Sequence, residues 1–139
     1  MIYLILGPSG SGKTKHLIEE ANSEKAKGNG NIVFIDTDDS HIFTLDYAVR
    51  LINAAKYGIK DSKMLYGFLA GIASRDYDIE KMYLDGIYDI INFNEDTFVE
   101  LIDNLNKLSD EFNVDIYFGL DKCQHELPKG IKAEMKVLC

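Results

Sequence analysis

Short apolar runs separated by mixed segments give the chain a repeating pattern. Four runs belong to it: IYLIL (2–6), IVFID (32–36), KMYLDG (81–86) and VDIYFGL (114–120). Each run is too short for a typical helix and is bounded by turn-forming or acidic residues. This pattern predicts four strands that are buried on both faces, as in the interior of a parallel sheet.

Between these runs, apolar residues recur at three- and four-residue spacing, which predicts helices that each bury one face. The first helix is expected over residues 14–27, with GNGN (28–31) as its stop signal. Asp61 or Ser62 can cap a second helix, and a third is expected from about 95 to 112.

Two segments fit more than one structure. YAVRLINAAKYGI (47–59) fits a strand or a helix, and its local alternation of apolar and polar residues favours a short edge strand. The tail ELPKGIKAEMKVLC (126–139) is expected to form a short turn and a last strand. Strands that alternate with helices predict one α/β domain over residues 1–139, a three-layer α/β/α sandwich around a mostly parallel sheet.

The bend after the first run, GPSGSGKT, is the sharpest motif in the sequence. It fits the phosphate-loop (Walker A) pattern G-x-x-x-x-G-K-[ST] at Gly7, Gly12, Lys13 and Thr14. Glycines let backbone N–H groups turn inward around phosphates, the lysine reaches the β- and γ-phosphates, and the threonine hydroxyl coordinates magnesium. The alternative is an ordinary strand–turn–helix. The residues expected to bind the nucleotide are Gly7, Pro8, Ser9, Gly10, Ser11, Gly12, Lys13 and Thr14.

Further polar residues follow later strands at the same predicted edge of the sheet, where ligands of such folds bind. Asp85 closes an apolar run and is expected to hold magnesium together with Thr14, as a Walker B aspartate does. The alternative is a turn residue in the Asp-Gly pair. His41 is interpreted as a loop histidine, with a contact to phosphate or to magnesium-bound water as the alternative.

In order and spacing, these motifs resemble the RecA-like core of the P-loop NTPases. The matching stretches are GPSGSGKT, IVFIDTDDSH, MYLDGIYDI and VDIYFGL, within residues 1–120. The resemblance implies that Asp38 orients the attacking water while Lys13 stabilises developing charge. It also implies that Asp85 is the Walker B acid and that the strand end at Asp121 senses the γ-phosphate. The whole chain is similar to short clostridial-type proteins known as twitching motility protein PilT or as ATP-binding protein, in GKTKHLIEEAN, GNIVFID, YGFLAGI, DYDIE and LDG.

The water-orienting acid has two rivals in the same segment. Asp36 and Asp39 flank Asp38, and a solvated acidic turn is the alternative for this segment. RecA-like enzymes tend to place glutamate where Asp38 stands, and the shorter side chain reaches a water molecule less well.

Two further departures from the family pattern predict slow hydrolysis. Gly86, rather than a catalytic glutamate, follows Asp85. Arg50 and Arg75 are the only arginines, so neither the arginines of pilus-retraction ATPases nor an arginine finger in cis is evident. What the resemblance implies is therefore nucleotide binding rather than pilus retraction.

The expected function is slow hydrolysis of magnesium-bound ATP, or of another nucleoside triphosphate, with Mg²⁺ and ATP as cofactors. Two alternatives use the same loop. A small-molecule kinase would need an acceptor pocket and a lid with several arginines. A non-hydrolysing switch or adaptor would order its loops when nucleotide binds and so control a partner.

Charge narrows the expected partners. The net charge of −8 at pH 7 disfavours nucleic acid and anionic membrane surfaces. No apolar run approaches the roughly 20 residues of a membrane helix, and no basic region precedes the first run, so a cytoplasmic protein is expected. A homo-oligomer or a protein partner stays open. Cys123 and Cys139 lack the spacing of a zinc site and are expected to be thiols in a reducing compartment.

Overall fold

The computed structural model describes residues 1–28 and 30–138, so Asn29 in the predicted helix stop and the thiol of Cys139 lie outside the described residues. Its strands are β1 Ile2–Leu6, β2 Asn31–Asp36, β3 Arg50–Asn53, β4 Ile79–Leu84, β5 Asp115–Leu120 and β6 Glu134–Val137. They form one six-stranded sheet in the order β3-β2-β4-β5-β1-β6, and each neighbouring pair is parallel. The predicted parallel sheet is confirmed.

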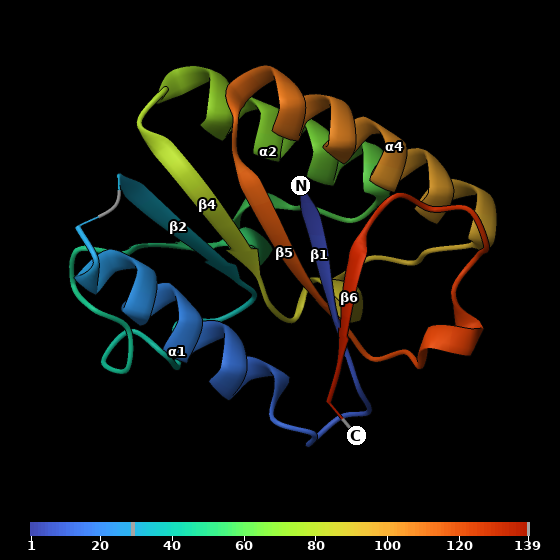
Figure 1. The fold of residues 1–139 in the computed structure, drawn as a ribbon, viewed down its shortest axis with the longest axis horizontal. Helices are drawn as coiled ribbons and strands as arrows, with labels where there is room; N and C mark the ends of the chain where they lie inside the picture. The colour runs from blue at the N-terminus through green and yellow to red at the C-terminus, as the bar shows by residue number, and fades with distance from the viewer. Residues whose placement is uncertain (29, 139) are drawn as a thin grey trace.

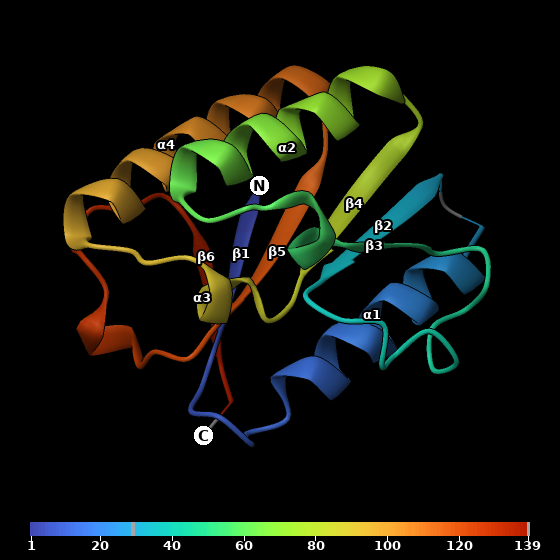
Figure 2. The same cartoon turned by 180° about the vertical axis from the view of Figure 1, so that it is seen from behind.

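Helices cover both faces of this sheet. They are α1 Lys13–Ala26, α2 Ser62–Arg75, α3 Ile87–Ile90 and α4 Glu95–Phe112, with short 3₁₀ turns η1 Ala54–Tyr57 and η2 Gln124–Glu126. Helix α1 lies on one face, and α2 and α4 lie side by side on the other (Figures 1 and 2). The architecture is therefore α/β and is compatible with the predicted three-layer sandwich. No helix in the described part of the chain has both the length and the apolar character that crossing a membrane requires.

The segments that fitted more than one structure follow the favoured predictions. Strand β3 lies at one edge of the sheet, as predicted, and η1 follows it directly. Strand β6 at the other edge is the predicted last strand, and the turn at Lys129 and Gly130 is the predicted short turn. The Asp61 side chain caps α2 by accepting a 2.8 Å hydrogen bond from the backbone N–H of Met64.

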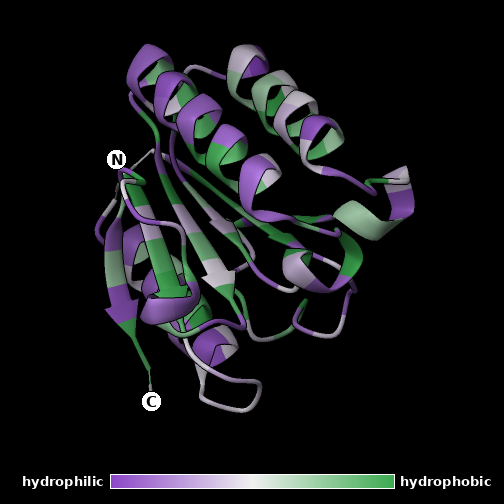
Figure 3. Cartoon of the chain, turned by 90° about the vertical axis from the view of Figure 1, so that its right-hand side faces the viewer, coloured by the Kyte–Doolittle hydropathy of each residue, from purple (hydrophilic) through white to green (hydrophobic). Residues whose placement is uncertain are grey.

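Polar and apolar positions segregate on the helices as their spacing predicts. Helix α4 buries Phe98, Leu101, Ile102, Leu105 and Leu108. Figure 3 shows the green, apolar parts of the upper helices turned toward the sheet and the purple, hydrophilic parts turned outward. Burial of this apolar stripe, which contributes about 25 cal/mol per Å² of apolar surface, stabilises the packing of α4 on the sheet.

Helix α1 is held on the opposite face by a row of aromatic rings. The rings belong to Phe34, Tyr83, Tyr117 and Tyr3, on the neighbouring strands β2, β4, β5 and β1. Successive ring centroids lie 6.3, 4.6 and 4.5 Å apart, in stacked geometry. Leu17 and Ile18 of α1 belong to the same apolar cluster as these rings. This packing sets the first turn of α1 beside the carboxyl end of β1.

Because the strands are parallel, their carboxyl ends lie at one edge of the sheet. The loop 7–12 follows β1, Asp36 ends β2, Asp85 follows β4 and Asp121 follows β5. The fold therefore gathers at one edge the residues that the sequence assigned to a phosphate and metal site.

Candidate functional site

The loop 7–12 between β1 and α1 adopts backbone conformations that glycine allows and other residues disfavour. Gly10 and Gly12 have φ of 83° and 93°, in the left-handed region that side chains disfavour. Gly7 has a different constraint, since an added Cβ would clash with the carbonyl oxygen of Leu138 and with Ser11 Oγ. The three glycines of the motif are thus required by shape.

The loop leads into α1, whose first backbone N–H groups have no side-chain cap within the described residues. Gly12 is the N-cap of α1 and offers no side-chain oxygen to the first N–H groups. The first hydrogen bond of the helix runs from the His16 N–H to Gly12 O at 2.9 Å, so the N–H groups before His16 have no partner in the helix. The first N–H groups of α1 and the positive end of its dipole are therefore suited to an anion.

Lys13 is buried, with 9% of its side chain exposed, and its ammonium is held at three points. It donates to Gly7 O at 2.8 Å and to Pro8 O at 2.9 Å. It also forms an ion pair with Asp121 Oδ1 at 2.7 Å. The charge predicted to meet phosphates thus lies beside the loop, and an acid at the end of β5 holds it there.

The two residues predicted to hold magnesium are in direct contact. Thr14 Oγ1 donates a 2.7 Å hydrogen bond to Asp85 Oδ2. Asp85 is 8% exposed, and its N–H donates to Ile35 O at 2.9 Å. Burial raises the pKa of the Asp85 carboxyl, while the hydrogen bond from Thr14 acts in the opposite direction.

Asp36 adds a second buried carboxylate beside Asp85. It is 4% exposed, and its Oδ1 accepts a 2.7 Å hydrogen bond from the Thr37 N–H. Its Oδ2 has no hydrogen-bond partner among the described residues. Burial, and then the negative charge of Asp85, raise the pKa of Asp36 to about 6.

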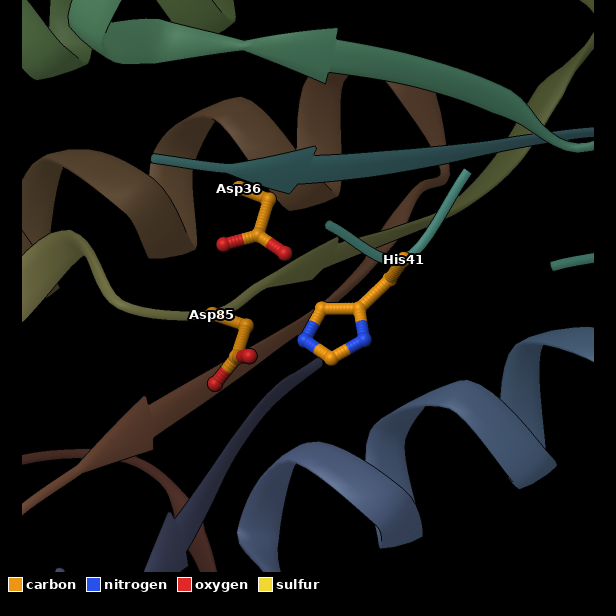
Figure 4. Close-up of side chains that lie close together, drawn as sticks. All are labelled: Asp36, His41 and Asp85. Carbon is orange, nitrogen blue, oxygen red and sulfur yellow. The ribbon is translucent and has the colours of Figure 1, made fainter. Parts of the chain in front are cut away.

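His41 reaches the same place from the loop after β2. One potential ligand atom from each of Asp36, His41 and Asp85 lies within 4.8 Å of the others. Figure 4 shows the imidazole approaching the two carboxylates from beside α1. His41 was interpreted from the sequence as a loop histidine, and it does lie in a loop, but the fold brings its ring to the candidate site.

Asp38 and its neighbour Asp39 are placed differently. Asp38 is exposed, and its Oδ1 accepts hydrogen bonds from Ser40 N at 2.8 Å and Ser40 Oγ at 2.6 Å. These bonds lower the pKa of the Asp38 carboxyl. Asp39 forms an ion pair with Lys56 at 3.0 Å. Of the three acids in this segment, Asp36 is the one that the structure sets against Asp85.

A cavity of ≈ 230 Å³ lies between these groups. Its lining is Ser9, Gly10, Lys13, Thr14, Asp36, Thr37, Asp38, His41, Asp85, Gly86, Tyr88, Asp89, Gly119 and Asp121. Tyr88, Asp89 and Gly119 were not predicted from the sequence. They line the cavity because α3 follows directly after Asp85 and Gly86 and because β5 carries no side chain at Gly119. Neither feature has a local sequence signal.

A second hollow of ≈ 600 Å³ runs from the loop along α1. It shares Gly10, Thr14 and His41 with the first cavity and continues past Lys15 and Ile18. Its volume lies in the range of small-molecule sites.

No protein-family model matches the chain, and the comparison with curated proteins finds no match. A functional conclusion therefore depends on the geometry of this edge.

Proposed function

We propose that this chain binds a nucleoside triphosphate, with ATP as the expected one, together with Mg²⁺, and hydrolyses it slowly. The observation that carries the proposal is the 2.7 Å contact between Thr14 Oγ1 and Asp85 Oδ2. These residues are 71 positions apart and were predicted as magnesium ligands from unrelated motifs. Their contact at the uncapped start of α1, beside Lys13, is what a magnesium–phosphate site requires.

The phosphate chain would lie in the 7–12 loop. Loop amides and the first turn of α1 supply N–H donors, and Lys13 supplies a positive charge that tracks the terminal phosphates. To reach a phosphate, the ammonium must exchange its contact with Asp121 for one with the ligand. The positive charge of Lys13 would thus have a negatively charged partner both without the ligand, in Asp121, and with it, in the phosphate.

The residues present fit a magnesium ion. Thr14 and Asp85 supply a hydroxyl and a carboxylate oxygen, which suit the oxygen coordination that Mg²⁺ prefers. Bound Mg²⁺ would draw off negative charge from the phosphate oxygens. Asp85 would orient a magnesium-bound water, while the buried walls of the cavity keep its field strong.

The nucleoside would occupy the larger hollow along α1. Its ≈ 600 Å³ adjoins the phosphate-sized cavity of ≈ 230 Å³, so the two together match the shape of a nucleotide. Lys15 and Ile18 line this hollow on α1, and Thr44 lines it on the facing loop.

Hydrolysis would be slow because the water-orienting group is weak. Asp38 lines the cavity, but it is exposed and Ser40 lowers the pKa of its carboxyl, so it is a poor base. Neither arginine lines the cavity among the described residues, and Arg50 is bound to Asp76 at 2.6 Å. An arginine finger contributes roughly 10³–10⁵ in rate in enzymes that have one.

The deciding experiment is a thermal-shift panel of nucleoside triphosphates with and without Mg²⁺, on the wild type, Lys13→Ala and Lys27→Ala. A ligand at 100 times its Kd stabilises by about 2.7 kcal/mol, so a shift of several degrees is expected for the wild type. Lys13→Ala should lose it. Lys27→Ala should keep it, because the Lys27 side chain is 63% exposed, pairs with Glu24 and lines neither cavity.

Phosphate release measured on the same proteins separates the alternatives. Slow magnesium-dependent release without an acceptor supports the ATPase. Release that rises with a nucleoside or sugar acceptor would indicate a kinase, and tight binding without release would indicate a switch. No shift with any nucleotide would overturn the proposal.

A further inference from the structure

We propose that Asp36, His41 and Asp85 form a site for a divalent first-row transition metal, such as Co²⁺, Mn²⁺ or Zn²⁺, which binds there in preference to Mg²⁺ and without nucleotide. The inference deepens the proposed function and rests on it in one respect. Asp85 belongs to both sets of ligands, so this ion would take the place of Mg²⁺ beside the phosphates.

The three side chains are close enough to share one ion. Their ligand atoms lie within 4.8 Å of one another. Three ligand atoms spread evenly at about 2.1 Å around a common metal are about 3.6 Å apart. Side-chain rotations that move each ligand atom by less than about 1 Å therefore bring all three atoms to bonding distance.

An independent observation points to a bound cation. Asp36 is 4% exposed, yet its Oδ2 has no hydrogen-bond partner among the described residues. A buried acceptor left in this way is costly, and a second buried carboxylate beside it adds repulsion. A dication placed between Asp36 and Asp85 would satisfy the open oxygen and cancel both negative charges.

The position of His41 is fixed by its backbone rather than by its ring. Its carbonyl oxygen accepts hydrogen bonds from Thr44 N at 3.0 Å and Leu45 N at 3.2 Å, and Leu45 is buried. Asn22 of α1 ties the same loop down, donating to Thr44 O at 3.0 Å and accepting from Asp46 N at 2.7 Å. The loop thus presents the imidazole to the carboxylates, and no hydrogen bond from another described residue occupies its ring nitrogens.

The donor set selects the class of metal. Mg²⁺ prefers six oxygen ligands and loses its water reluctantly. Imidazole suits Zn²⁺, Fe²⁺, Co²⁺ and Ni²⁺, and affinity for a mixed nitrogen and oxygen site rises from Mn²⁺ through Co²⁺. One imidazole with two carboxylates therefore favours a transition metal. Three protein ligands leave coordination positions that face the phosphate cavity.

The test is a Co²⁺ titration of the chelator-treated protein without nucleotide, followed by visible absorption and by competition with Mg²⁺. One Co²⁺ per chain is expected, with absorption bands that a hundredfold excess of Mg²⁺ does not remove. His41→Ala should weaken Co²⁺ binding at least about tenfold, as loss of metal-supporting groups does. Its Mg²⁺ affinity should change less than twofold.

A second variant and a matched control keep the test decisive. His41→Asp replaces the imidazole with a third carboxylate, which gives an all-oxygen set of ligands. The preference of this variant for Co²⁺ over Mg²⁺ should therefore be lower than that of the wild type. His16→Ala should bind Co²⁺ as the wild type does, because His16 pairs with Glu20 on α1 and does not line the cavity. Equal loss in His16→Ala and His41→Ala, or displacement of Co²⁺ by an equal concentration of Mg²⁺, would overturn the inference.

The two proposals fail separately. Lys13→Ala should bind Co²⁺ normally and no nucleotide. A wild type that binds Co²⁺ selectively but no nucleotide would overturn the proposed function alone. A wild type that binds magnesium–ATP but does not distinguish Co²⁺ from Mg²⁺ would overturn the metal inference alone.

Discussion

The hydroxyl of Thr14 and the carboxylate of Asp85 are joined by a 2.7 Å hydrogen bond that crosses the end of an intervening strand. Thr14 lies on α1, which follows β1, whereas Asp85 follows β4, and β5 lies between β1 and β4 in the sheet. Gly119 of β5 leaves the space open. A Cβ there would lie 3.2 Å from Leu17 Cδ1 and 3.7 Å from Asp85 Oδ1, so a side chain at this position would crowd the carboxylate.

Replacing Thr14 tests this bond as a magnesium site. Thr14→Val keeps the shape but removes the oxygen, so magnesium should no longer strengthen nucleotide binding, and affinity with Mg²⁺ should fall at least about tenfold. Thr14→Ser keeps the oxygen and should retain most of the effect. Nucleotide affinity measured by calorimetry with Mg²⁺ and with EDTA checks both variants. Equal magnesium dependence in Thr14→Val and the wild type would contradict the assignment.

The sequence predicts most of this fold because the local patterns of apolar and capping residues agree with the overall arrangement of strands and helices. IYLIL, IVFID and VDIYFGL are strands close to their expected bounds, and Asp61 caps α2 as its position predicts. The shortest elements carry the least signal. Helix α3 has four residues and was not predicted, since a single turn leaves no hydrophobic period to detect.

The site is only partly readable from the sequence. The predicted phosphate loop is a contiguous motif, and Asp85 follows a recognisable strand. Among Asp36, Asp38 and Asp39, however, no spacing separates a buried acid from exposed ones. The distinction arises because Asp36 is the last residue of β2, whereas Asp38 lies in the turn that Ser40 closes. His41 depends on a loop anchored 19 residues back, at Asn22, which no local pattern reveals.

Asp38→Asn tests the weak-base explanation for slow hydrolysis. Phosphate release should fall by less than about tenfold, and nucleotide affinity should stay within twofold, because the exposed carboxylate is already engaged by Ser40. Asp39→Asn is the matched control and should leave release unchanged, since Asp39 pairs with Lys56. Steady-state phosphate assays measure both. A loss of 100-fold or more in Asp38→Asn would mean that Asp38 acts as a full general base.

Asp36→Asn should change how stability depends on pH. Burial raises the folded-state pKa of Asp36 to about 6, above its unfolded value. The stability that this carboxyl contributes is therefore complete below about pH 4 and is lost as pH rises through 6. Asparagine does not ionise in this range. The free energy of unfolding of the variant, relative to that of the wild type, should therefore rise by about 2 kcal/mol between pH 4 and pH 7.

Urea unfolding in EDTA across this pH range measures that difference. Asp38→Asn provides a control, because hydrogen bonds from Ser40 lower the pKa of Asp38 in the folded state. The stability that this carboxyl contributes is lost only as pH falls below about 4, so between pH 4 and pH 7 the difference between this variant and the wild type should stay constant. A difference between Asp36→Asn and the wild type that stays flat with pH would show that Asp36 is not held in a charge-disfavouring site.

Gly86→Ala tests whether the turn after Asp85 shapes the site. Gly86 has a φ of 72°, and an added Cβ would lie 2.8 Å from Thr37 Oγ1 and 3.5 Å from Asp36 Oδ1. The substitution should cost about 1–3 kcal/mol in unfolding free energy from backbone strain and crowding. Because Thr37 N holds Asp36 Oδ1 at 2.7 Å, displacing Thr37 should also weaken Co²⁺ binding.

Gly67→Ala separates this local effect from the general effect of removing a glycine. Gly67 lies inside α2, is exposed, and has open space where a Cβ would be added. Alanine there should stabilise the protein by about 0.5–1 kcal/mol and leave Co²⁺ binding unchanged. If Gly86→Ala matched the wild type in both stability and Co²⁺ affinity, the turn would tolerate a side chain. The position of Asp36 beside Asp85 would then not depend on glycine.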